Sequence, residues 1–367
     1  MLRFIVYLFL CSAFCISLGE LTARFFFDPS DILQVTYEDD PILGHKIGSL
    51  QSGHDEWGFR NKAVPQNADI LILGDSFAYG TNATANNSWP AQLENKTGQT
   101  VYNTGISGYG PLHYLHILKD RAPHLTPQHA IFSIYLGDDF GDAYDLAYAH
   151  SEWASYRNSP TKSPITASAY APPMEGSIIL DELSLWLGKR SVLYGLIAAN
   201  SGVQLIKNQP NYSNVPTIAA TNKSYNSLLA TSENTNPRPL TDQRQIEGFS
   251  ITARAIKKAH DYCQENDIKF HVVLVPAKEH VIAHSSAKPL KKPTALVNKI
   301  NILEYQHAQI LDFLKNENIS YVDLHSAFIK AIGHADIYPE TGMHTTSLGY
   351  EVSALAVSNT FQLHKTE

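Results

Sequence analysis

Short apolar runs alternate with segments of helical periodicity along most of the chain. The apolar runs predict strands at residues 70–73, 100–103, 130–136, 270–275 and 320–324. Apolar positions at helical spacing predict a helix that begins near Ser88, with Pro90 in its first turn, and further helices at residues 112–119, 252–265, 297–314 and 347–363. Strands alternating with helices predict an α/β fold: a parallel sheet of about five strands, covered on both faces by helices.

This alternation is interrupted between the third and fourth predicted strands by a stretch rich in Ser, Asn, Pro, Ala and Tyr. Residues 181–199 form its one amphipathic piece, whereas residues 209–239 offer few large apolar side chains and favour a poorly ordered loop. An insertion that leaves the carboxyl end of a central strand hangs over that edge, so we interpret it as a cap or lid. We therefore predict a lead-in segment at residues 25–67, an α/β domain formed by residues 68–140 and 241–367, and the insertion at residues 141–240.

The amino-terminal segment carries no charge from Phe4 to Gly19, between Arg3 and Glu20. This apolar run is long for the core of a cleaved signal and slightly short for a spanning helix of about 20 residues. Residues 1–24 are therefore interpreted as a signal peptide or a membrane anchor, with a buried helix as the alternative. Either of the first two interpretations predicts export, with the body secreted or held at the membrane facing the periplasm or the extracellular side.

Composition and charge narrow the partners. The 367 residues are enough for one large domain with an insertion, and 28 Lys and Arg against 35 Asp and Glu give a net charge of -7. Because no basic stripe with interleaved aromatic residues is present, nucleic acid is not an expected partner. Only Cys263 lies outside the apolar leader, so the body has no internal disulfide and no metal-binding cysteine spacing, and we expect no metal or other cofactor.

Chemically useful residues follow four of the five predicted strands. The first strand ends at Gly74 and is followed by Asp75 and Ser76. In open α/β sheets ligands bind at the carboxyl edge of the strands. An acyl-transfer site needs a hydroxyl nucleophile, a base within hydrogen-bond reach and amide donors for the oxyanion. Candidates for the remaining parts follow the second, third and last strands, at residues 103–110, 137–139 and 342–344.

These blocks resemble the SGNH, or GDSL, hydrolase family over about residues 70–354, excluding the insertion. The resemblance is carried by Gly58-Phe59-Arg60, Gly74-Asp75-Ser76, Asn103 to Gly108, Gly137-Asp138-Asp139 and His344. It implies a flavodoxin-like three-layer sandwich and the hydrolysis of an ester or acetyl ester, or acyl transfer. It also implies Ser76 as nucleophile, His344 as general base, and the amides of Ser76 and Gly108 in the oxyanion hole. Lipids, acylated sugars and cell-surface polysaccharides are typical substrates of the family.

The chain departs from the family pattern at the oxyanion hole. Asp138 stands where the family usually has an asparagine whose amide donates to the oxyanion. An ionised carboxylate repels that charge, and losing one such donor costs on the order of 10²- to 10³-fold in rate. A desolvated Asp138 that stays protonated can instead donate a hydrogen bond.

The second departure concerns the orientation of the imidazole. The family's aspartate, three residues before His344, is replaced by Thr341. Glu340 or Asp336 can take its place, or a backbone carbonyl can hold the ring. We therefore predict a dyad of Ser76 and His344, or a triad completed by Glu340.

Two other classes of function remain open beside an exported esterase or acyltransferase that acts on an acylated envelope component. One is a catalytically weak relative that binds glycan or assists polysaccharide assembly, because of Asp138 and Thr341. The other is a phosphoryl-transfer enzyme that binds a divalent metal through acidic residues at the same edge, namely Asp75, Asp138, Asp139 and Asp142. Expected partners are a glycan, lipid or small-molecule ester, and the membrane.

Three residues outside these blocks are interpreted as structural or solvated. His271 lies within a predicted strand and His325 just past one, which favours structural roles for both imidazoles. Lys278 follows the fourth predicted strand. It can contact an acidic group of a substrate, but a solvated lysine is the preferred interpretation.

Overall fold

The chain forms two compact units, which we call the small unit and the large unit. The computed structural model describes all residues except 159–179, 201–216, 222–225, 231–238, 286–287, 290–292, 333 and 364–367. The small unit comprises residues 1–38, 46–63 and 172–210, and the large unit comprises residues 39–45, 64–171 and 211–367.

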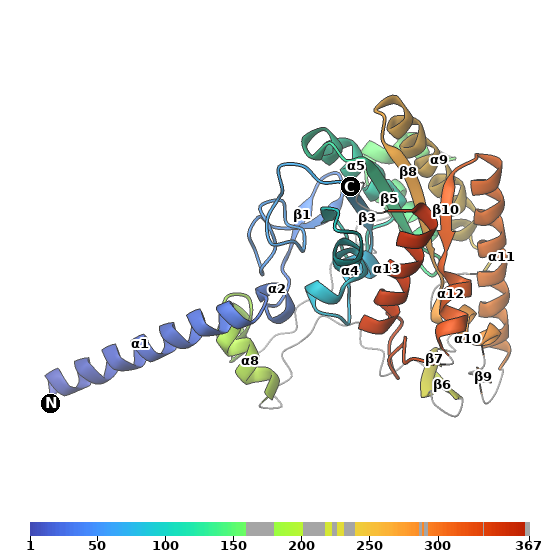
Figure 1. Ribbon diagram of the computed structural model, residues 1–367. Helices are drawn as coiled ribbons and strands as arrows, with labels where there is room; N and C mark the ends of the chain where they lie inside the picture. Colours follow the sequence, from blue (N-terminus) through green and yellow to red (C-terminus); the bar gives the residue numbers. More distant parts are fainter. Residues whose placement is uncertain are drawn as a thin grey trace. The chain divides into compact units, whose positions relative to one another are not determined.

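A five-stranded parallel sheet lies at the centre of the large unit (Figure 1). Its strands are β3 (Ile70–Gly74), β4 (Val101–Asn103), β5 (His129–Tyr135), β8 (Lys269–Val275) and β10 (Ser320–Asp323). They lie in the order β10-β8-β5-β3-β4, which in chain order is the 2-1-3-4-5 arrangement of flavodoxin-like folds. The five predicted strands are confirmed to within one residue at each end.

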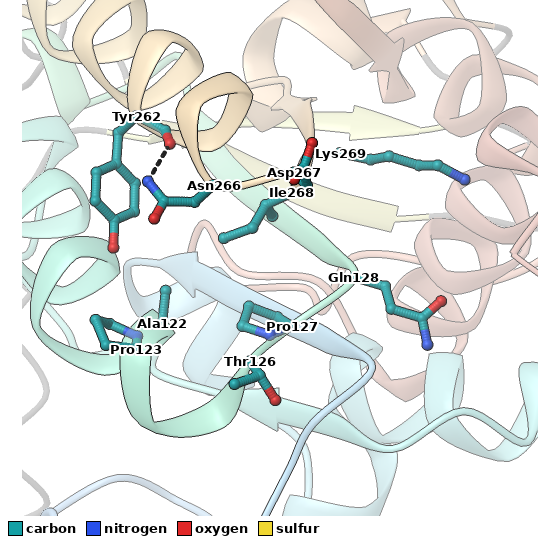
Figure 2. A pocket seen from close by; sticks show the side chains of 10 residues that line it. All are labelled: Ala122, Pro123, Thr126, Pro127, Gln128, Tyr262, Asn266, Asp267, Ile268 and Lys269. Atoms are coloured by element: carbon teal, nitrogen blue, oxygen red, sulfur yellow. Dashed lines mark hydrogen bonds between the residues drawn. The ribbon is translucent and has the colours of Figure 1, made fainter.

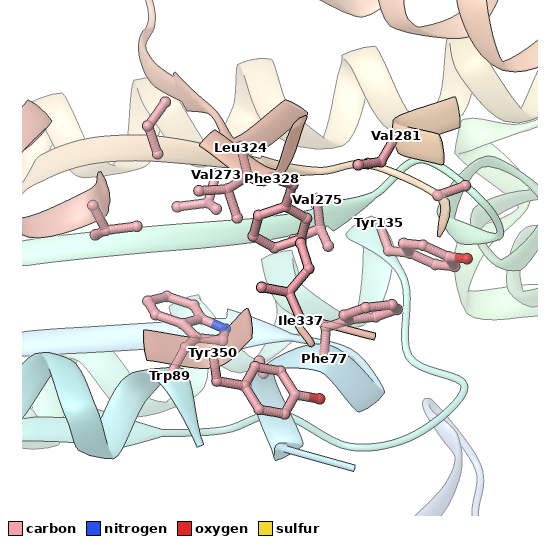
Figure 3. Close-up of a cluster of buried hydrophobic side chains, with 14 of the residues drawn as sticks. Phe77, Trp89, Tyr135, Val273, Val275, Val281, Leu324, Phe328, Ile337 and Tyr350 are labelled. Atoms are coloured by element: carbon pink, nitrogen blue, oxygen red, sulfur yellow. The ribbon is translucent and has the colours of Figure 1, made fainter. Parts of the chain in front are cut away.

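Both faces of the sheet are apolar because alternate residues of each strand point to opposite sides. Ile70 and Ile72 belong to a core cluster that includes Phe77, Trp89 and Phe328 (Figure 3). Besides the short helix that carries Phe77, the helices that contribute side chains to this cluster are α4 (Trp89–Thr97), α10 (Lys278–His284), α11 (Thr294–Asn316), α12 (Leu324–Ala331) and α13 (Ser347–Phe361).

Three other helices cover the opposite face: α5 (Pro111–Leu125), α6 (Asp139–Ala149) and α9 (Gln243–Glu265). Phe132 of β5 contacts Tyr114 of α5 edge to face, with ring centroids 5.5 Å apart. Phe140 of α6 meets Phe249 of α9 at 5.4 Å. The large unit is therefore a three-layer α/β sandwich, as predicted.

Helix limits follow local chemistry where the pattern alone was ambiguous. Ser88 caps α4, with Pro90 in the first turn, and Gly98 ends it in the left-handed conformation at φ 67°. Helix α9 begins nine residues before its predicted start, capped by Asp242. Its early residues are polar and include Gly248, at which a Cβ atom would lie 2.0 Å from the carbonyl oxygen of Phe140. The glycine thus permits close packing on α6 and also breaks the apolar periodicity.

The predicted insertion contains regular structure where it is described. Residues 141–149 form most of α6 and pack against α9. Strands β6 (Thr217–Thr221), β7 (Asn226–Ala230) and β9 (Lys288–Pro289) form a small antiparallel sheet. Apart from β6, β7 and Pro239, the stretch predicted to be a poor loop lies outside the described residues, and the lid role stays a prediction.

The small unit contains the amino-terminal helix α1 (Leu2–Phe26), together with α2 (Pro29–Ile32), α7 (Leu180–Gly188) and α8 (Val192–Asn200). The most apolar 18-residue window of α1 has a mean hydropathy of 2.0 and is not buried, so the length and composition of this helix suit a signal or a membrane span. The far end of α1 packs on α8 through Ala23 and Val192. Glu20 accepts hydrogen bonds from the backbone amides of Val192 and Leu193.

Short elements complete the described structure: β1 (Tyr37–Asp40), β2 (Gly44–Ile47), α3 (Ser76–Tyr79), η1 (Ala85–Asn87) and η2 (Ser151–Tyr156).

Candidate active site

Ser76 stands at the carboxyl edge of the sheet because β3 turns sharply into a helix. A Cβ atom at Gly74 would lie 2.6 Å from that of Ala78 and 2.9 Å from that of Ser133, so only glycine fits the turn. Asp75 caps the short helix α3, accepting a hydrogen bond of 2.9 Å from the amide of Phe77. Ser76 is the first residue of that helix and remains half-buried.

The hydroxyl of Ser76 and the imidazole of His344 are brought together across 268 positions in the chain. Ser76 Oγ lies 2.8 Å from His344 Nε2, which is hydrogen-bond distance. The ring of His344 also packs on Phe77, with centroids 4.8 Å apart. A hydroxyl and a base in this geometry meet the first requirement for nucleophilic catalysis.

Lys278 holds the loop that carries His344. Its ammonium group donates hydrogen bonds to the carbonyl oxygens of Pro339, at 3.1 Å, and Gly342, at 3.0 Å. The side chain is buried, with 2% of the residue exposed, so the interpretation as a solvated lysine is wrong. Burial lowers the pKa of Lys278 to about 8, against the opposing effect of the Glu279 and Glu340 carboxylates. The sequence held no signal for this role because the loop lies some sixty residues further along the chain.

Burial alone determines the acidity of His344. It lowers the pKa of the imidazole to about 4, and no carboxylate among the residues that the structure describes raises it. Thr341, where the family has an aspartate, is exposed. The charge of Glu340 acts on Lys278, whose pKa it raises. An orienting role for Glu340 therefore stays a prediction, and the structure supplies the dyad geometry.

The glycine-containing loop after β4 is tied to the Ser76 turn. Asn103 donates from Nδ2 to the carbonyl oxygen of Ala78 at 2.8 Å and accepts from the amide of Gly105 at 2.9 Å. The amide of Ile106 donates to the carbonyl oxygen of Gly74 at 3.2 Å. Gly108 adopts φ 80°, a left-handed conformation that favours glycine. The predicted oxyanion donor thus lies on a loop anchored to the nucleophile's own turn.

His45 supports the same loop and was not found from the sequence. Its Nε2 lies 3.0 Å from the carbonyl oxygen of Ser107, and because a carbonyl only accepts, this nitrogen carries the proton. A Cβ atom at position 108 would lie 3.5 Å from His45 Cε1. Tyr109 donates its hydroxyl to the carbonyl oxygen of His45 at 2.7 Å. A single histidine 62 residues upstream of its partner leaves no pattern that sequence inspection can detect.

Several carboxyl groups gather behind the nucleophile. Asp138 is the residue that precedes α6. Burial, and next the charge of Asp138, raise the pKa of Asp75 to about 7, although the amide of Phe77 opposes this shift. Asp139 is fully buried, which raises the pKa of its carboxyl well above the ordinary value, and it accepts hydrogen bonds from the Tyr135 amide and the Tyr114 hydroxyl. Among the described residues, these carboxylates do not converge as a group of three metal ligands.

A shallow pocket of about 490 Å³ lies at the other end of the sheet (Figure 2). It is lined by residues at the amino ends of β5 and β8, including Gln128 and Lys269. Because all five strands are parallel, this end is opposite to the edge that carries Ser76. The pocket is therefore separate from the Ser76 and His344 pair.

Comparison with known proteins gives distant structural matches. No family model matches the chain, and no curated protein matches its sequence. The chain is similar to a member of the lipolytic protein G-D-S-L family from Veillonella parvula (10% identity, TM-score 0.40, covering 80% of this chain and 97% of that one). It is also similar to a GDSL-like lipase from Bacteroides thetaiotaomicron (11%, 0.38, 82% and 92%) and to a catalytic mutant of an acetylxylan esterase from Geobacillus stearothermophilus (10%, 0.37, 83% and 99%). At these TM-scores we base function on the site itself.

Proposed function

We propose that this protein is an SGNH-type serine esterase in which Ser76 attacks the acyl carbon of an ester and His344 acts as general base. The observation that carries the proposal is the distance of 2.8 Å between Ser76 Oγ and His344 Nε2 at the carboxyl edge of a flavodoxin-like sheet. Burial keeps the imidazole neutral at physiological pH, so its lone pair is available to the hydroxyl.

The reaction proceeds in two half-reactions. As Ser76 Oγ bonds to the carbonyl carbon, its proton moves to His344 Nε2 and the carbonyl oxygen becomes an oxyanion. The backbone amides of Ser76 and Gly108 donate hydrogen bonds to that oxygen. The imidazolium then protonates the leaving alcohol, and the acyl group stays on Ser76. Water deprotonated by His344 releases the acid, and an acceptor hydroxyl in its place would give acyl transfer.

Asp138 is the acidic residue that can act on the oxyanion in this scheme. Its charge raises the pKa of Asp75, which precedes the nucleophile, so it lies close enough to act on the site. If ionised, it opposes the oxyanion; if protonated, it donates a third hydrogen bond. A catalytically weak relative that binds glycan is the second candidate, favoured by this carboxylate and by the exposed Thr341.

We further propose that α1 is a retained membrane anchor and that the substrate is an acylated glycan or lipid of the cell envelope. Helix α1 runs without a break to Phe26, past the small residues Ser17 and Gly19, which would suit a signal cleavage before Glu20. Glu20 caps the amino end of α8, which integrates the end of the leader with the rest of the small unit. The intact mass of the protein recovered from membranes tests retention, because cleavage would remove about twenty residues.

Labelling with a fluorophosphonate probe tests the catalytic proposal, because the reagent reacts with activated serines. We expect full-length protein in detergent to be labelled and to release nitrophenol from p-nitrophenyl acetate without added metal. Ser76→Ala and His344→Ala should abolish both signals, whereas Ser151→Ala and His124→Ala, at exposed positions, should retain them. Activity that survives Ser76→Ala rejects the esterase mechanism, and activity lost on adding a chelator favours metal-dependent chemistry.

A further inference from the structure

We propose that His280, His284 and His325 form a binding site for a divalent transition metal, with Zn²⁺ as the preferred ion. Each residue offers one ligand atom, and these three atoms lie within 4.8 Å of one another. The site belongs to the large unit and is distinct from the Ser76 and His344 pair. Metal binding at this site does not depend on the esterase mechanism.

The local fold brings the three imidazoles together. His280 and His284 are four residues apart on α10, so they occupy the same face of the helix, a spacing used by zinc-binding helices. His325 lies in the first turn of α12, which packs against α10. The ring centroids of His280 and His325 are 4.0 Å apart. The ring centroid of His284 lies 5.2 Å from that of His280 and 5.4 Å from that of His325.

Hydrogen bonds around His284 prepare one nitrogen for a cation. Its Nδ1 lies 3.0 Å from the carbonyl oxygen of His280, and since a carbonyl only accepts, Nδ1 carries the proton. Metal-binding histidines commonly donate their second nitrogen to a backbone carbonyl in this way. The lone pair on Nε2 then faces the carboxylate of Glu304, 3.2 Å away. Two acceptors at this distance need a proton or a metal ion between or beside them.

The second ligand, His280, is enclosed by the fold. His280 is 2% exposed, and its Nδ1 has no hydrogen-bond partner among the described residues. A buried polar atom without a partner is unusual in a native structure and is consistent with a site that takes a ligand.

Charge and access also suit a dication. Asp323, which accepts from His307 Nε2 at 2.9 Å, and Glu304 place two carboxylates around the three rings. The ring of His307 lies 5.2 Å from those of His280 and His325.

His284 is exposed to solvent, which gives an ion a path of entry and leaves a fourth position for water. Three imidazoles with an open position suit Zn²⁺, and Cu²⁺ and Ni²⁺ share the preference for imidazole. The sequence predicts no such site because His325 lies 41 residues after His284, outside any metal-binding spacing.

Zinc titration of the full-length protein tests this inference. Cys11→Ser and Cys15→Ser are introduced throughout, because these exposed thiols can bind zinc themselves. After treatment with a chelator and its removal, calorimetry with ZnCl₂ should show one site per chain, and Co²⁺ should give the visible absorption of a tetrahedral complex. Ser76→Ala should bind zinc as tightly as the parent protein, which separates this result from the fate of the esterase proposal.

Variants at exposed positions keep the test independent of folding. His284→Gln should weaken zinc binding by at least ~10- to 100-fold, and Glu304→Gln, which removes the outer carboxylate, by a similar or smaller factor. His334→Gln, at another exposed histidine, should leave binding unchanged. Circular dichroism confirms that each variant is folded. The proposal is overturned if the parent protein has no stoichiometric zinc site. It is also overturned if folded His284→Gln and His325→Gln bind zinc as tightly as the parent protein.

Discussion

The partly buried imidazole of His344 should extend the proposed esterase activity to unusually acidic pH. An ordinary histidine, with a pKa of about 6.5, is only about 3% neutral at pH 5. At a pKa of about 4, His344 is ~90% neutral at the same pH, so the active fraction of enzyme is larger by roughly 30-fold. The acid limb of kcat/KM should therefore fall near pH 4. The same low basicity predicts a modest plateau, because a weaker base removes the hydroxyl proton less readily.

The assay is the hydrolysis of p-nitrophenyl acetate between pH 3.5 and 9, with quenched samples read at alkaline pH. Thr341→Asp provides the matched comparison. A carboxylate beside the imidazole stabilises its charged form and raises its pKa. This variant should therefore shift the acid limb to higher pH and raise the plateau value of kcat/KM. Both changes have the same cause, and a variant that shows neither has not placed its carboxylate against the ring.

Asp75 titrates in the neutral range and must be separated from His344. Its pKa of about 7 and its position 3.4 Å from Ser76 Oγ allow a second inflection in the profile. Asp75→Asn should remove that inflection and leave the limb near pH 4. An inflection between pH 6 and 7 that persists in Asp75→Asn would refute the reasoning, because it would assign His344 an ordinary pKa despite its burial.

Three further outcomes are expected. Asp138→Asn should raise kcat at neutral pH by up to ~10²-fold if the carboxylate opposes the oxyanion, and a fall in kcat would show that the carboxyl group has another task. Lys278→Met should lower kcat by ~10- to 100-fold while KM and the urea midpoint change little, because the loop loses two hydrogen bonds but no ammonium remains buried. A parallel fall in stability and activity would instead make Lys278 merely structural. The metal-free protein should lose stability as pH falls from about 6.5 to about 3: the pKa of His280 is about 3 when folded and ordinary when unfolded, so the unfolded chain binds more protons in that window. Urea unfolding across this range checks the sign, and a flat profile in the parent protein, or an unchanged slope in His280→Gln, contradicts it.

The sheet was predictable because its strands carry a strong local signal. Residues such as Ile70 to Leu73 are apolar without interruption, as strands covered on both faces must be, and the structure places each predicted strand within a residue. Helix α9 was predicted too short because its first turns depend on tertiary contact with α6 at Gly248, which no local periodicity records.

The candidate site was predictable only in part, for a related reason. Ser76 closely follows β3, and His344 lies between the last strand and the final helix, so topology alone suggests that they meet. The residues that support them leave no such trace. His45 and Lys278 act through backbone carbonyls far away in the chain, and a carbonyl oxygen has no residue identity for a pattern to detect. Burial, which determines the acidity of His344, is likewise a property of the folded state.

The hydroxyl of Ser76 is synthesised early and its base comes from the last thirty residues, with most of the polypeptide between them. A nascent or truncated chain thus contains the nucleophile but nothing to activate it. Under the proposed mechanism, the chain therefore cannot hydrolyse an ester before the segment that carries His344 has folded. This delay follows from the position of His344 in the chain, after all five strands of the parallel sheet.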